Sequence, residues 1–367
     1  METFDIHPLF SLLHFFMLCL LCFNVTNIEA SNNKVSAIYV FGDSTVDPGN
    51  NNYVNTPFKS DFPPYGRDFA NKLPTGRFTN GKLGTDFVAS YLGLKELVPP
   101  YLDPNLSDEE LMTGVSFASA GSGFDPLTPT LGNVIPIPKQ LEYFKEYKKR
   151  VESKIGKKRA ENHMNNAVFF ISAGTNDFVV NYFTVPIRRR NYNLLTYRQF
   201  LLQHMTDFIQ NLWTEGARKI AFVGLPPMGC LPIMITLNSG NNAFLERSCV
   251  DKYSAVARDH NTVLQHELFL MQLNFSNPRH AAKISYIDIY GPLDNMIQGH
   301  GSPGFDEVDR GCCGSGLIEA TFMCNSISHV CSDPSKYVFW DSIHPTEKAY
   351  HDMFMAARHT IDALING

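Results

Sequence analysis

Residues 37–47 read AIYVFGDSTVD, a run of apolar residues followed by a glycine and a mostly polar segment. Strands that are covered on both faces of a sheet appear as short, nearly continuous apolar runs rich in β-branched and aromatic residues. The stretch therefore predicts a buried strand over Ala37–Phe41. It also places Ser44 just beyond the carboxyl end of that strand.

Similar apolar runs recur along the chain, and segments with helical periodicity separate them. The runs are VFFIS at 168–172, IAFV at 220–223 and ISYIDI at 284–289; the helical segments are 196–213, 253–273 and 347–365. In the first helical segment one stripe carries Phe200, Leu201, Phe208, Ile209 and Trp213, and in the second Val256, Val263, Leu264 and Leu270. Alternating strands and helices predict an α/β fold, a three-layer α/β/α sandwich with a mostly parallel sheet. Chemistry in such folds is found in the loops at the carboxyl ends of the strands.

The composition is that of an ordinary globular chain. The 367 residues are 44% hydrophobic and 18% charged, and 31 Lys+Arg against 36 Asp+Glu give a net charge of −5. This charge argues against a nucleic-acid partner, and the short basic tracts at 148–150, 157–159 and 188–190 read as solvated faces or loops. At roughly 150 residues per domain the length alone suggests about two domains.

The first thirty residues differ from the rest. Residues 9–23 read LFSLLHFFMLCLLCF, which is too short for a comfortable membrane span but fits the apolar region of a secretory signal peptide. The segment before it carries Glu2 and Asp5 but no Lys or Arg, and that departure keeps an uncleaved anchor open as the alternative. We expect residues 1–30 to be a signal peptide and the protein to be secreted, extracellular or in the cell wall, without a stable membrane span.

Six cysteines follow the first thirty residues, and an even number in a secreted chain suggests disulfides. A zinc site is the alternative for the last four, but the adjacent pair Cys312-Cys313 lacks the two-residue gap that lets two thiolates bind one metal. Cys230 with Cys249 is the simplest pairing for one bridge. Asn105 and Asn274 begin glycosylation sequons. The six cysteines are Cys230, Cys249, Cys312, Cys313, Cys324 and Cys331.

Ser44 is a candidate nucleophile because the end of a strand can hold it rigidly and still expose it to solvent. A loop serine is more often structural, for example a helix cap. The Gly-x-Ser-x-Gly turn of α/β-hydrolases occurs nowhere in the chain. A serine hydrolase built on Ser44 therefore needs another framework that supplies a base, an orienting acid and oxyanion donors.

The base and acid have one distinctive candidate pair, in the segment FWDSIHP at 339–345. Asp341 and His344 form the only Asp-x-x-His pair in the chain. In a turn this spacing lets the carboxylate hold the imidazole tautomer, and Pro345 disfavours helical geometry at His344 and suits the first turn of a following helix. The alternative is that His344 only caps that helix.

Two further segments could donate hydrogen bonds to an oxyanion. Asn176, in SAGTND at 172–177, follows the second strand and carries a side-chain NH₂, although Asn after Gly commonly forms an Asx turn. Gly121 lies in the small-residue segment VSFASAGSG at 115–123 and can present its N–H at close range. A mononucleotide-binding loop is the competing interpretation of this segment, but neither of its glycine motifs occurs there.

The four segments that carry Ser44, Gly121, Asn176 and the Asp341–His344 pair together resemble the GDSL esterase/lipase family, in its secreted plant branch within the SGNH hydrolases. Further matching blocks lie between them: DPGNNN at 47–52, GRFTNG at 76–81 and GCCG at 311–314. Each block alone is weak evidence, but all of them in order, over nearly the whole chain after residue 30, are specific. One position departs from the commonest plant pattern, since Ala120 stands where a Gly often precedes the oxyanion Gly. Ala adopts most of the conformations that Gly adopts unless φ is positive, so this departure bears only on the local geometry of the loop.

The resemblance implies a role for each matching residue and a flavodoxin-like fold. Ser44 would be the nucleophile, His344 the general base and then acid, and Asp341 the residue that orients His344. The oxyanion hole would comprise the N–H groups of Ser44 and Gly121 and the side chain of Asn176. The reaction would be hydrolysis of a small-molecule or lipid ester, and it needs no metal or organic cofactor. One site that draws on residues 42–344 also favours a single domain over 31–367.

Two other functions stay open at the level of sequence. Acyl transfer to a lipid or metabolite hydroxyl uses the same residues, and a secreted binding protein could keep the fold without turnover. The aromatic, Pro-rich segment 53–67 could line an acyl pocket, cover it, or be an ordinary surface loop. Residues 124–127 carry the same ambiguity. The sequence specifies neither the acyl and alcohol groups nor the oligomeric state.

Overall fold

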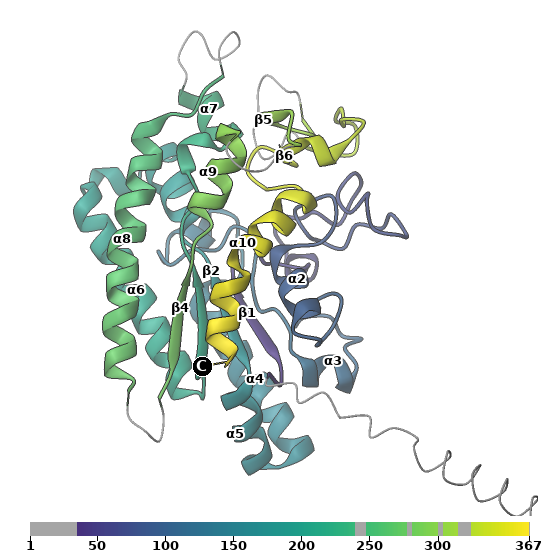
Figure 1. Ribbon diagram of the computed structural model, residues 1–367, viewed down its shortest axis with the longest axis vertical. Helices are drawn as coiled ribbons and strands as arrows, with labels where there is room; N and C mark the ends of the chain where they lie inside the picture. The colour runs from purple at the N-terminus through teal and green to yellow at the C-terminus, as the bar shows by residue number, and fades with distance from the viewer. Residues whose placement is uncertain (1–34, 239–246, 277–280, 300–303, 315–323, 367) are drawn as a thin grey trace, which may run out of the picture. The chain divides into compact units, whose positions relative to one another are not determined.

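The computed structural model describes residues 35–366, except 239–246, 277–280, 300–303 and 315–323 (Figure 1). The predicted signal peptide over 1–30 lies outside the described residues. From Val35 onward the chain forms one compact unit.

A four-stranded parallel sheet forms the centre of this unit. Its strands are β1 (Ile38–Gly42), β2 (Val168–Ser172), β3 (Lys219–Val223) and β4 (Lys283–Ile287), and they lie in the order β1-β2-β3-β4. All four coincide, within one or two residues at their ends, with the predicted apolar runs. The mostly parallel sheet of the α/β prediction is thereby confirmed.

A short extended segment adds to the outer edge of β1. Val40 N donates to Val115 O, Phe117 N donates to Val40 O, and Ser119 N donates to Gly42 O, with distances of 3.1, 2.7 and 3.0 Å. This pairing is parallel at Ser116. Because the chain crosses from β1 to this edge and then back to β2 on the other side of β1, the strand order has its topological switch point at β1. That order is flavodoxin-like.

Helices cover both faces of the sheet and make the second and third layers (Figure 1). On one face lie α4, α6 and α8; on the other lie α2 and α10, which contact each other and the sheet. The helix bounds are α2 (Gly84–Tyr91), α3 (Asp108–Thr113), α4 (Ile137–Ile155), α5 (Lys157–Asn166), α6 (Leu194–Thr214), α7 (Pro232–Asn238), α8 (Asp251–Asn274), α9 (Tyr290–Gln298) and α10 (Glu347–Asn366).

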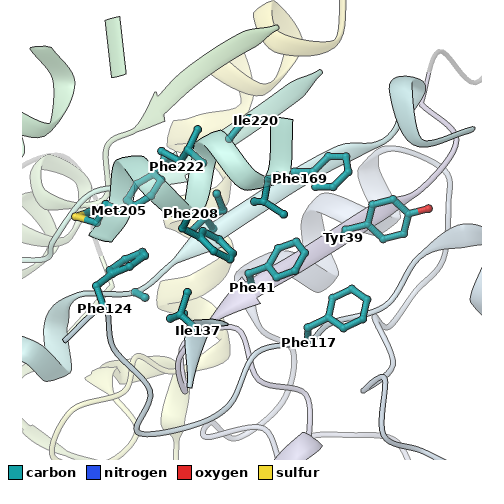
Figure 2. Packing of buried hydrophobic residues seen from close by; sticks show 14 of the residues in the cluster. Tyr39, Phe41, Phe117, Phe124, Ile137, Phe169, Met205, Phe208, Ile220 and Phe222 are labelled. Atoms are coloured by element: carbon teal, nitrogen blue, oxygen red, sulfur yellow. The ribbon is translucent and has the colours of Figure 1, made fainter. Parts of the chain in front are cut away.

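The alternation of side chains along the strands divides the core in two. Tyr39 and Phe41 of β1 face the α4–α6–α8 side, where they pack edge-on or stacked against Phe117, Phe144 and Phe169 (Figure 2). Their neighbours Ile38 and Val40 face α2 and α10 instead. Every residue of β1 and β2 is buried, which explains why these strands read as continuous apolar runs.

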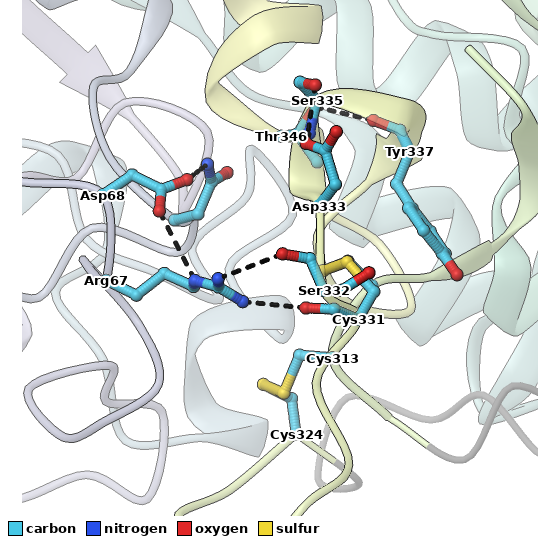
Figure 3. The surroundings of a disulfide bond; sticks show 12 residues. Arg67, Asp68, Cys313, Cys324, Cys331, Ser332, Asp333, Ser335, Tyr337 and Thr346 are labelled. Atoms are coloured by element: carbon cyan, nitrogen blue, oxygen red, sulfur yellow. Dashed lines mark hydrogen bonds and ion pairs between the residues drawn. A yellow bond between two sulfur atoms is a disulfide. The ribbon is translucent and has the colours of Figure 1, made fainter.

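A two-stranded parallel sheet, β5 (Glu307–Gly311) with β6 (Tyr337–Phe339), lies next to the loop that leads into α10. Two disulfides, Cys312–Cys331 and Cys313–Cys324, hold this region, and Arg67 donates to the carbonyl oxygens of Cys331 and Ser332 (Figure 3). A third disulfide joins Cys230 to Cys249, the pair expected from the sequence. All six cysteines are therefore in disulfides, and no thiolate is left for the zinc alternative.

Candidate active site

Ser44 lies in the turn that follows β1, at the carboxyl edge of the sheet. Gly42 makes this turn possible: its φ is +141°, and a Cβ there would lie 1.8 Å from the backbone oxygen of Ser172. Asp43 N still donates to Ser172 O at 3.0 Å. The chain thus leaves the sheet one residue before Ser44, which is itself only 7% exposed.

Ser44, His344 and Asp341 form one continuous hydrogen-bonded chain. The Ser44 Oγ lies 2.8 Å from His344 Nε2, and His344 Nδ1 lies 2.8 Å from both carboxylate oxygens of Asp341. The two segments are 300 residues apart in sequence, yet all three side chains are buried. The structure therefore brings Ser44 together with the Asp341 and His344 pair that the sequence singled out.

The loop that carries His344 is a tight turn, not the start of a helix. Asp341 Oδ1 accepts hydrogen bonds from the backbone N–H groups of Ile343 and His344 at 2.9 and 2.8 Å, and Trp340 N donates to His344 O at 2.7 Å. Pro345 pairs with Phe339 in an antiparallel bridge, and α10 begins two residues later, at Glu347. His344 is therefore fixed by its own turn and does not cap α10.

The surroundings of Asp341 keep this carboxylate ionised although it is fully buried. Burial acts to raise its pKa, but the His344 imidazole and the two N–H donors outweigh burial, so the pKa of Asp341 lies below its usual value. Tyr65 adds a further hydrogen bond, from its hydroxyl to Asp341 Oδ2 at 2.8 Å. Burial and the Asp341 charge raise the pKa of the Tyr65 hydroxyl well above its usual value, so this group stays a donor.

Gly121 and Asn176 lie beside Ser44 and His344 in one pocket. Gly121 has a φ of +85°, whereas Ala120 is absent from the positive-φ positions, so glycine is needed at 121 and not at 120. The Asn176 side-chain NH₂ donates to Ser122 O at 3.0 Å and keeps a second hydrogen. Among the described residues, the backbone N–H groups of Ser44 and Gly121 have no acceptor. Three donors are thus available around one space next to the Ser44 Oγ.

Two buried carboxyls hold the segment that carries Gly121. Asp47 accepts hydrogen bonds from the backbone of Gly49, Asn50 and Ala120 at 2.8, 2.7 and 2.9 Å. Asn51 donates to Ala120 O at 3.0 Å. The block DPGNNN therefore fixes Ala120, the residue before Gly121.

On the far side of Gly121, Asp177 performs the same task. It accepts from the backbone N–H groups of Phe124 and Asp125 at 2.8 and 3.1 Å, and from the Thr128 hydroxyl at 2.5 Å. Since Asp177 follows Asn176 directly, it couples the segment of Asn176 to the segment that follows Gly121.

The segment 53–67 belongs to the site and is not an ordinary surface loop. Phe58 lines the pocket and packs against Gly121, where an added Cβ would come within 2.9 Å of its ring. Tyr65 donates to Asp341 from the same loop. The Tyr65 contact was missed at the level of sequence, where the one available signal was an aromatic hydroxyl in a loop shortly after Ser44.

Residues 124–127 contribute to the packing of the core and to a partly buried ion pair. The Phe124 ring packs in the core against Phe208 and Phe222 (Figure 2). Asp125 forms a two-pronged ion pair with Arg188, with N–O distances of 2.7 and 2.5 Å. The basic tract 188–190 is therefore only partly the solvated face that the sequence suggested.

The described residues can also be checked for a metal site, a membrane-spanning helix and accessible glycosylation sequons. No cluster of three or more His, Cys, Asp or Glu side chains in this part of the chain is arranged to hold a metal ion. In the same residues no helix combines the length and apolarity that crossing a membrane requires. Asn105 and Asn274 are both exposed, so both sequons are accessible.

Comparison with known proteins gives concordant matches. A family model described as GDSL-like lipase/acylhydrolase matches residues 38–357. A GDSL esterase/lipase of Arabidopsis thaliana is 58% identical over 333 residues, which covers 91% of this chain and 88% of the relative. GDSL esterase/lipase APG of the same plant is 44% identical and covers 86% of this chain and 88% of its own.

Among solved structures, a catalytic mutant of Axe2, an acetylxylan esterase from Geobacillus stearothermophilus, aligns over 90% of this chain and 94% of its own. Its identity is 12% and its TM-score 0.37, and so low a likeness carries no inference about this protein.

Proposed function

Because this chain belongs to the family of GDSL-like lipases and acylhydrolases, we propose that it is a serine esterase that hydrolyses carboxylic esters through an acyl-enzyme on Ser44. The observation that carries the proposal is the hydrogen-bonded chain from the Ser44 Oγ through the His344 ring to Asp341, with 2.8 Å at each step. An imidazole placed between a hydroxyl and a buried carboxylate is the arrangement that makes a serine nucleophilic.

In the first half of the reaction, His344 Nε2 takes the proton of Ser44 as its Oγ attacks the ester carbonyl carbon. Asp341 holds Nδ1–H toward itself and stabilises the imidazolium that forms. The carbonyl oxygen gains negative charge and accepts hydrogen bonds from the N–H groups of Ser44 and Gly121 and from Asn176. The alcohol then leaves with the proton from His344.

In the second half, water replaces the alcohol. His344 removes a proton from the water, which attacks the acyl carbon, and the same three donors hold the second tetrahedral oxyanion. The acid leaves as the proton returns to the Ser44 Oγ. The atoms of this scheme balance with water as the only co-reactant.

A fluorophosphonate probe tests the nucleophile directly, because it labels activated serines covalently. We expect labelling of the wild-type protein and of Ser335→Ala, which removes an exposed serine, and none of Ser44→Ala. Labelling of Ser44→Ala at the wild-type level would remove Ser44 from the proposal. Hydrolysis of p-nitrophenyl esters by the same three proteins should follow the labelling.

The Asn176 side chain is the easiest oxyanion donor to delete. Loss of one such donor costs about 10²–10³ in kcat, so Asn176→Ala should lose about that much while its circular dichroism stays that of the wild type. Turnover within a factor of two of wild type would exclude Asn176 from the oxyanion hole.

Acyl transfer uses the same residues with a hydroxyl in place of water. Mass spectrometry of the products formed from an acyl donor plus a polyol separates the two reactions. Free acid as the main product supports hydrolysis, and a new ester of the polyol identifies a transferase.

We also propose that residues 1–30 direct secretion and that 31–367 form one hydrolase domain. The three disulfides and the exposed sequons at Asn105 and Asn274 fit an oxidising, glycosylating compartment. N-terminal sequencing of protein secreted by plant cells should start near Ser31, and a glycosidase that removes N-glycans should lower its apparent mass. An intact N-terminus at Met1 would contradict the signal peptide.

A further inference from the structure

A cavity separate from the pocket of Ser44 lies between the sheet and the helices α2 and α10. Its walls include Phe170 and Val223 from the sheet, Val88 from α2, and Ala357 and Ile361 from α10. No charged side chain lines it, and the polar residues in its wall are only Ser, Thr and Tyr.

The upper end of this cavity lies at the proposed active site. Thr45, Thr175 and Ile343 line it, and each is the direct chain neighbour of a site residue: Ser44, Asn176 and His344 respectively. Ile343 lines both the cavity and the pocket of Ser44. Thr45, Thr175 and Ile343 are partly exposed, whereas Val88, Ala357 and Ile361 at the other end are buried. The cavity therefore opens beside the reacting atoms and closes inside the protein.

The cavity is also elongated. Its α10 wall runs from Tyr350 to Ile361, which corresponds to about 16 Å at 1.5 Å per helical residue. A narrow, uncharged space of this length, closed at one end, matches an extended hydrocarbon chain in shape and polarity.

The Tyr350 hydroxyl in the cavity wall has no hydrogen-bond partner among the described residues, and an occupant of the cavity could supply one. Tyr350 is only 6% exposed. Buried hydroxyls in folded proteins usually have a partner in the protein, in water or in a ligand. The hydroxyl lies near enough to Asp43 and Asp341 for their charges to act on it, which places it at the end of the cavity nearest the site.

We propose that this cavity binds the hydrocarbon chain of the acyl group, so that the preferred substrates are esters of medium- and long-chain fatty acids. The inference rests on the proposed esterase function. The acyl arm is favoured over the alcohol arm because the alcohol must depart while the acyl group is still bonded to Ser44. If the alcohol chain lay in the closed cavity, the acyl group bonded to Ser44 would block its departure. The pocket lined by Phe58 and Leu131 gives the alcohol a separate exit.

Two neighbouring alanines of α10 give a matched pair of variants. Ala357 faces the cavity and is 7% exposed, whereas Ala356 is exposed to solvent. Ala357→Phe fills the inner part of the cavity, and Ala356→Phe adds the same ring to the surface. Neither residue belongs to the proposed catalytic machinery, and thermal unfolding checks that both variants fold.

The first measurement is kcat/KM for p-nitrophenyl esters from butyrate to palmitate. Each CH₂ kept out of an apolar site forfeits a factor of about four. We therefore expect Ala357→Phe to lose at least about tenfold on laurate and palmitate and to keep its activity on butyrate. Ala356→Phe should match wild type throughout. An unchanged chain-length profile in Ala357→Phe would overturn the proposal, and so would a profile that depends on the length of the alcohol instead.

The second measurement needs no catalysis. cis-Parinaric acid, a fatty acid that fluoresces in apolar surroundings, is titrated into Ser44→Ala with and without Ala357→Phe. Saturable binding that weakens at least about tenfold with Ala357→Phe, but not with Ala356→Phe, supports the cavity even if no ester is turned over. Equal binding by all three proteins would overturn it. The titration thus separates failure of the acyl cavity from failure of the esterase function.

Discussion

Asp341 is the residue on which the geometry of the site depends most. Its two oxygens accept hydrogen bonds from the His344 ring, from two backbone N–H groups and from the Tyr65 hydroxyl. All of these partners act as donors. The His344 ring and the two backbone N–H groups hold the pKa of Asp341 below its usual value despite its burial, so the carboxylate stays charged and can accept from all of them. The carboxylate thus fixes both the turn and the ring tautomer.

Asp341→Asn should therefore abolish most activity without unfolding the protein. The amide keeps one acceptor but turns an NH₂ toward a donor, which favours the wrong imidazole tautomer, and such a change in a Ser-His-Asp triad lowers kcat about 10⁴-fold. The measurement is kcat on a short p-nitrophenyl ester. Asp61→Asn, at an exposed carboxyl of the same loop as Tyr65, serves as control. Activity of Asp341→Asn within tenfold of that control would mean that Asp341 does not orient His344.

Gly121 is a second residue of the site, and the role we propose for it rests on its backbone N–H. An alanine there must adopt a φ near +85° and bring its Cβ within 2.9 Å of the Phe58 ring. The left-handed conformation costs about 1–2 kcal/mol, and relief of the contact moves the N–H that faces the oxyanion. We expect Gly121→Ala to lose about 10-fold or more in kcat, up to the 10²–10³ of a lost donor.

Gly156 provides a matched control for Gly121. Its φ is +81°, and an added Cβ meets nothing within 4 Å. With a ψ of 152°, residue 156 lies in a region that only glycine adopts readily, so Gly156→Ala should lower the free energy of unfolding by about 1–3 kcal/mol and leave kcat unchanged. Equal kcat losses in both variants would show that general destabilisation, not the donor, explains the effect at 121.

At the scale of elements, the apolar patterns of the sequence predicted only elements that bury a run or stripe of apolar side chains. The four strands and the long helices α6, α8 and α10 were predictable because each buries a continuous run or stripe. The stripe chosen for α8 was partly wrong, since Leu270 is 38% exposed while His260 and Asn261 are buried. Asn261 bonds the backbone N–H and C=O of Leu225 at 2.8 Å each. Asn261 is buried because its side chain bonds the backbone of a loop, and a hydrophobicity pattern cannot reveal a polar residue that is buried for this reason.

Helix α4 and the strands β5 and β6 went unpredicted, for different reasons. Helix α4 carries a clear stripe at Ile137, Leu141, Phe144, Tyr147 and Val151, so its periodicity was readable. Strands β5 and β6 are short and mostly half-buried, and they exist because two disulfides and a non-local pairing hold them. The Ser44, His344 and Asp341 set was predictable because family motifs mark it; the Tyr65 contact depends on a loop conformation that no local pattern encodes.

The disulfides allow a comparison at this same scale. Cys230–Cys249 and Cys312–Cys331 both join residues 19 apart, so loop closure assigns each about 3 kcal/mol of stabilisation. The second contacts the segment that carries Asp341 with one of its own residues, because Cys312 N donates to Phe339 O at 3.0 Å. Next to the first, the contact with this segment is made by Ile233, whose N–H donates to Ser342 O at 2.9 Å. Removal of the second bridge should therefore disturb the site as well as the stability.

Double Cys→Ser variants at the two bridges test this difference. Both should lower the free energy of unfolding by similar amounts. The Cys312/Cys331 variant should in addition lose kcat at temperatures where it is still folded, by more than the Cys230/Cys249 variant. The opposite ranking of kcat would show that the β5–β6 region does not position Asp341. Denaturant unfolding and ester hydrolysis on the same samples give both quantities.

At the scale of the whole molecule, the site exists because the sheet reverses its strand order at β1. Ser44 follows β1, Asn176 follows β2, and Gly121 follows the edge segment on the other side of β1, so three donors from distant stretches meet at one edge. His344 comes from the last loop, before α10. One sheet needs residues from 38 to 287 to be complete, and this favours the single domain that we propose over the two domains that the length alone suggests.

The same edge gathers buried acids whose titration should govern stability. Burial raises the pKa of Asp43 and Asp47 to about 6 and that of Asp177 to about 7, against the partial opposition of their hydrogen bonds. Between pH 4 and pH 6–7 the folded protein therefore holds protons that the unfolded chain releases. Stability contributed by these groups is present below about pH 4 and is lost as the pH rises through their folded pKa values. Asp341, whose pKa is lowered, contributes in the opposite sense at lower pH.

A difference measurement isolates one of these acids. Asp43→Asn keeps an oxygen that can accept from Thr45 N and Oγ1, which lie 3.0 and 2.7 Å from Asp43 Oδ1, and it removes the titration. Because a shift of one pKa unit corresponds to about 1.4 kcal/mol, wild type should lose on the order of 3 kcal/mol relative to this variant between pH 4 and pH 7.5. Urea unfolding at several pH values, with Asp61→Asn as the exposed control, measures this difference. A difference between Asp43→Asn and wild type that does not change with pH would mean that Asp43 is ionised throughout, so that its hydrogen bonds with Thr45 and the proximity of His344 outweigh its burial.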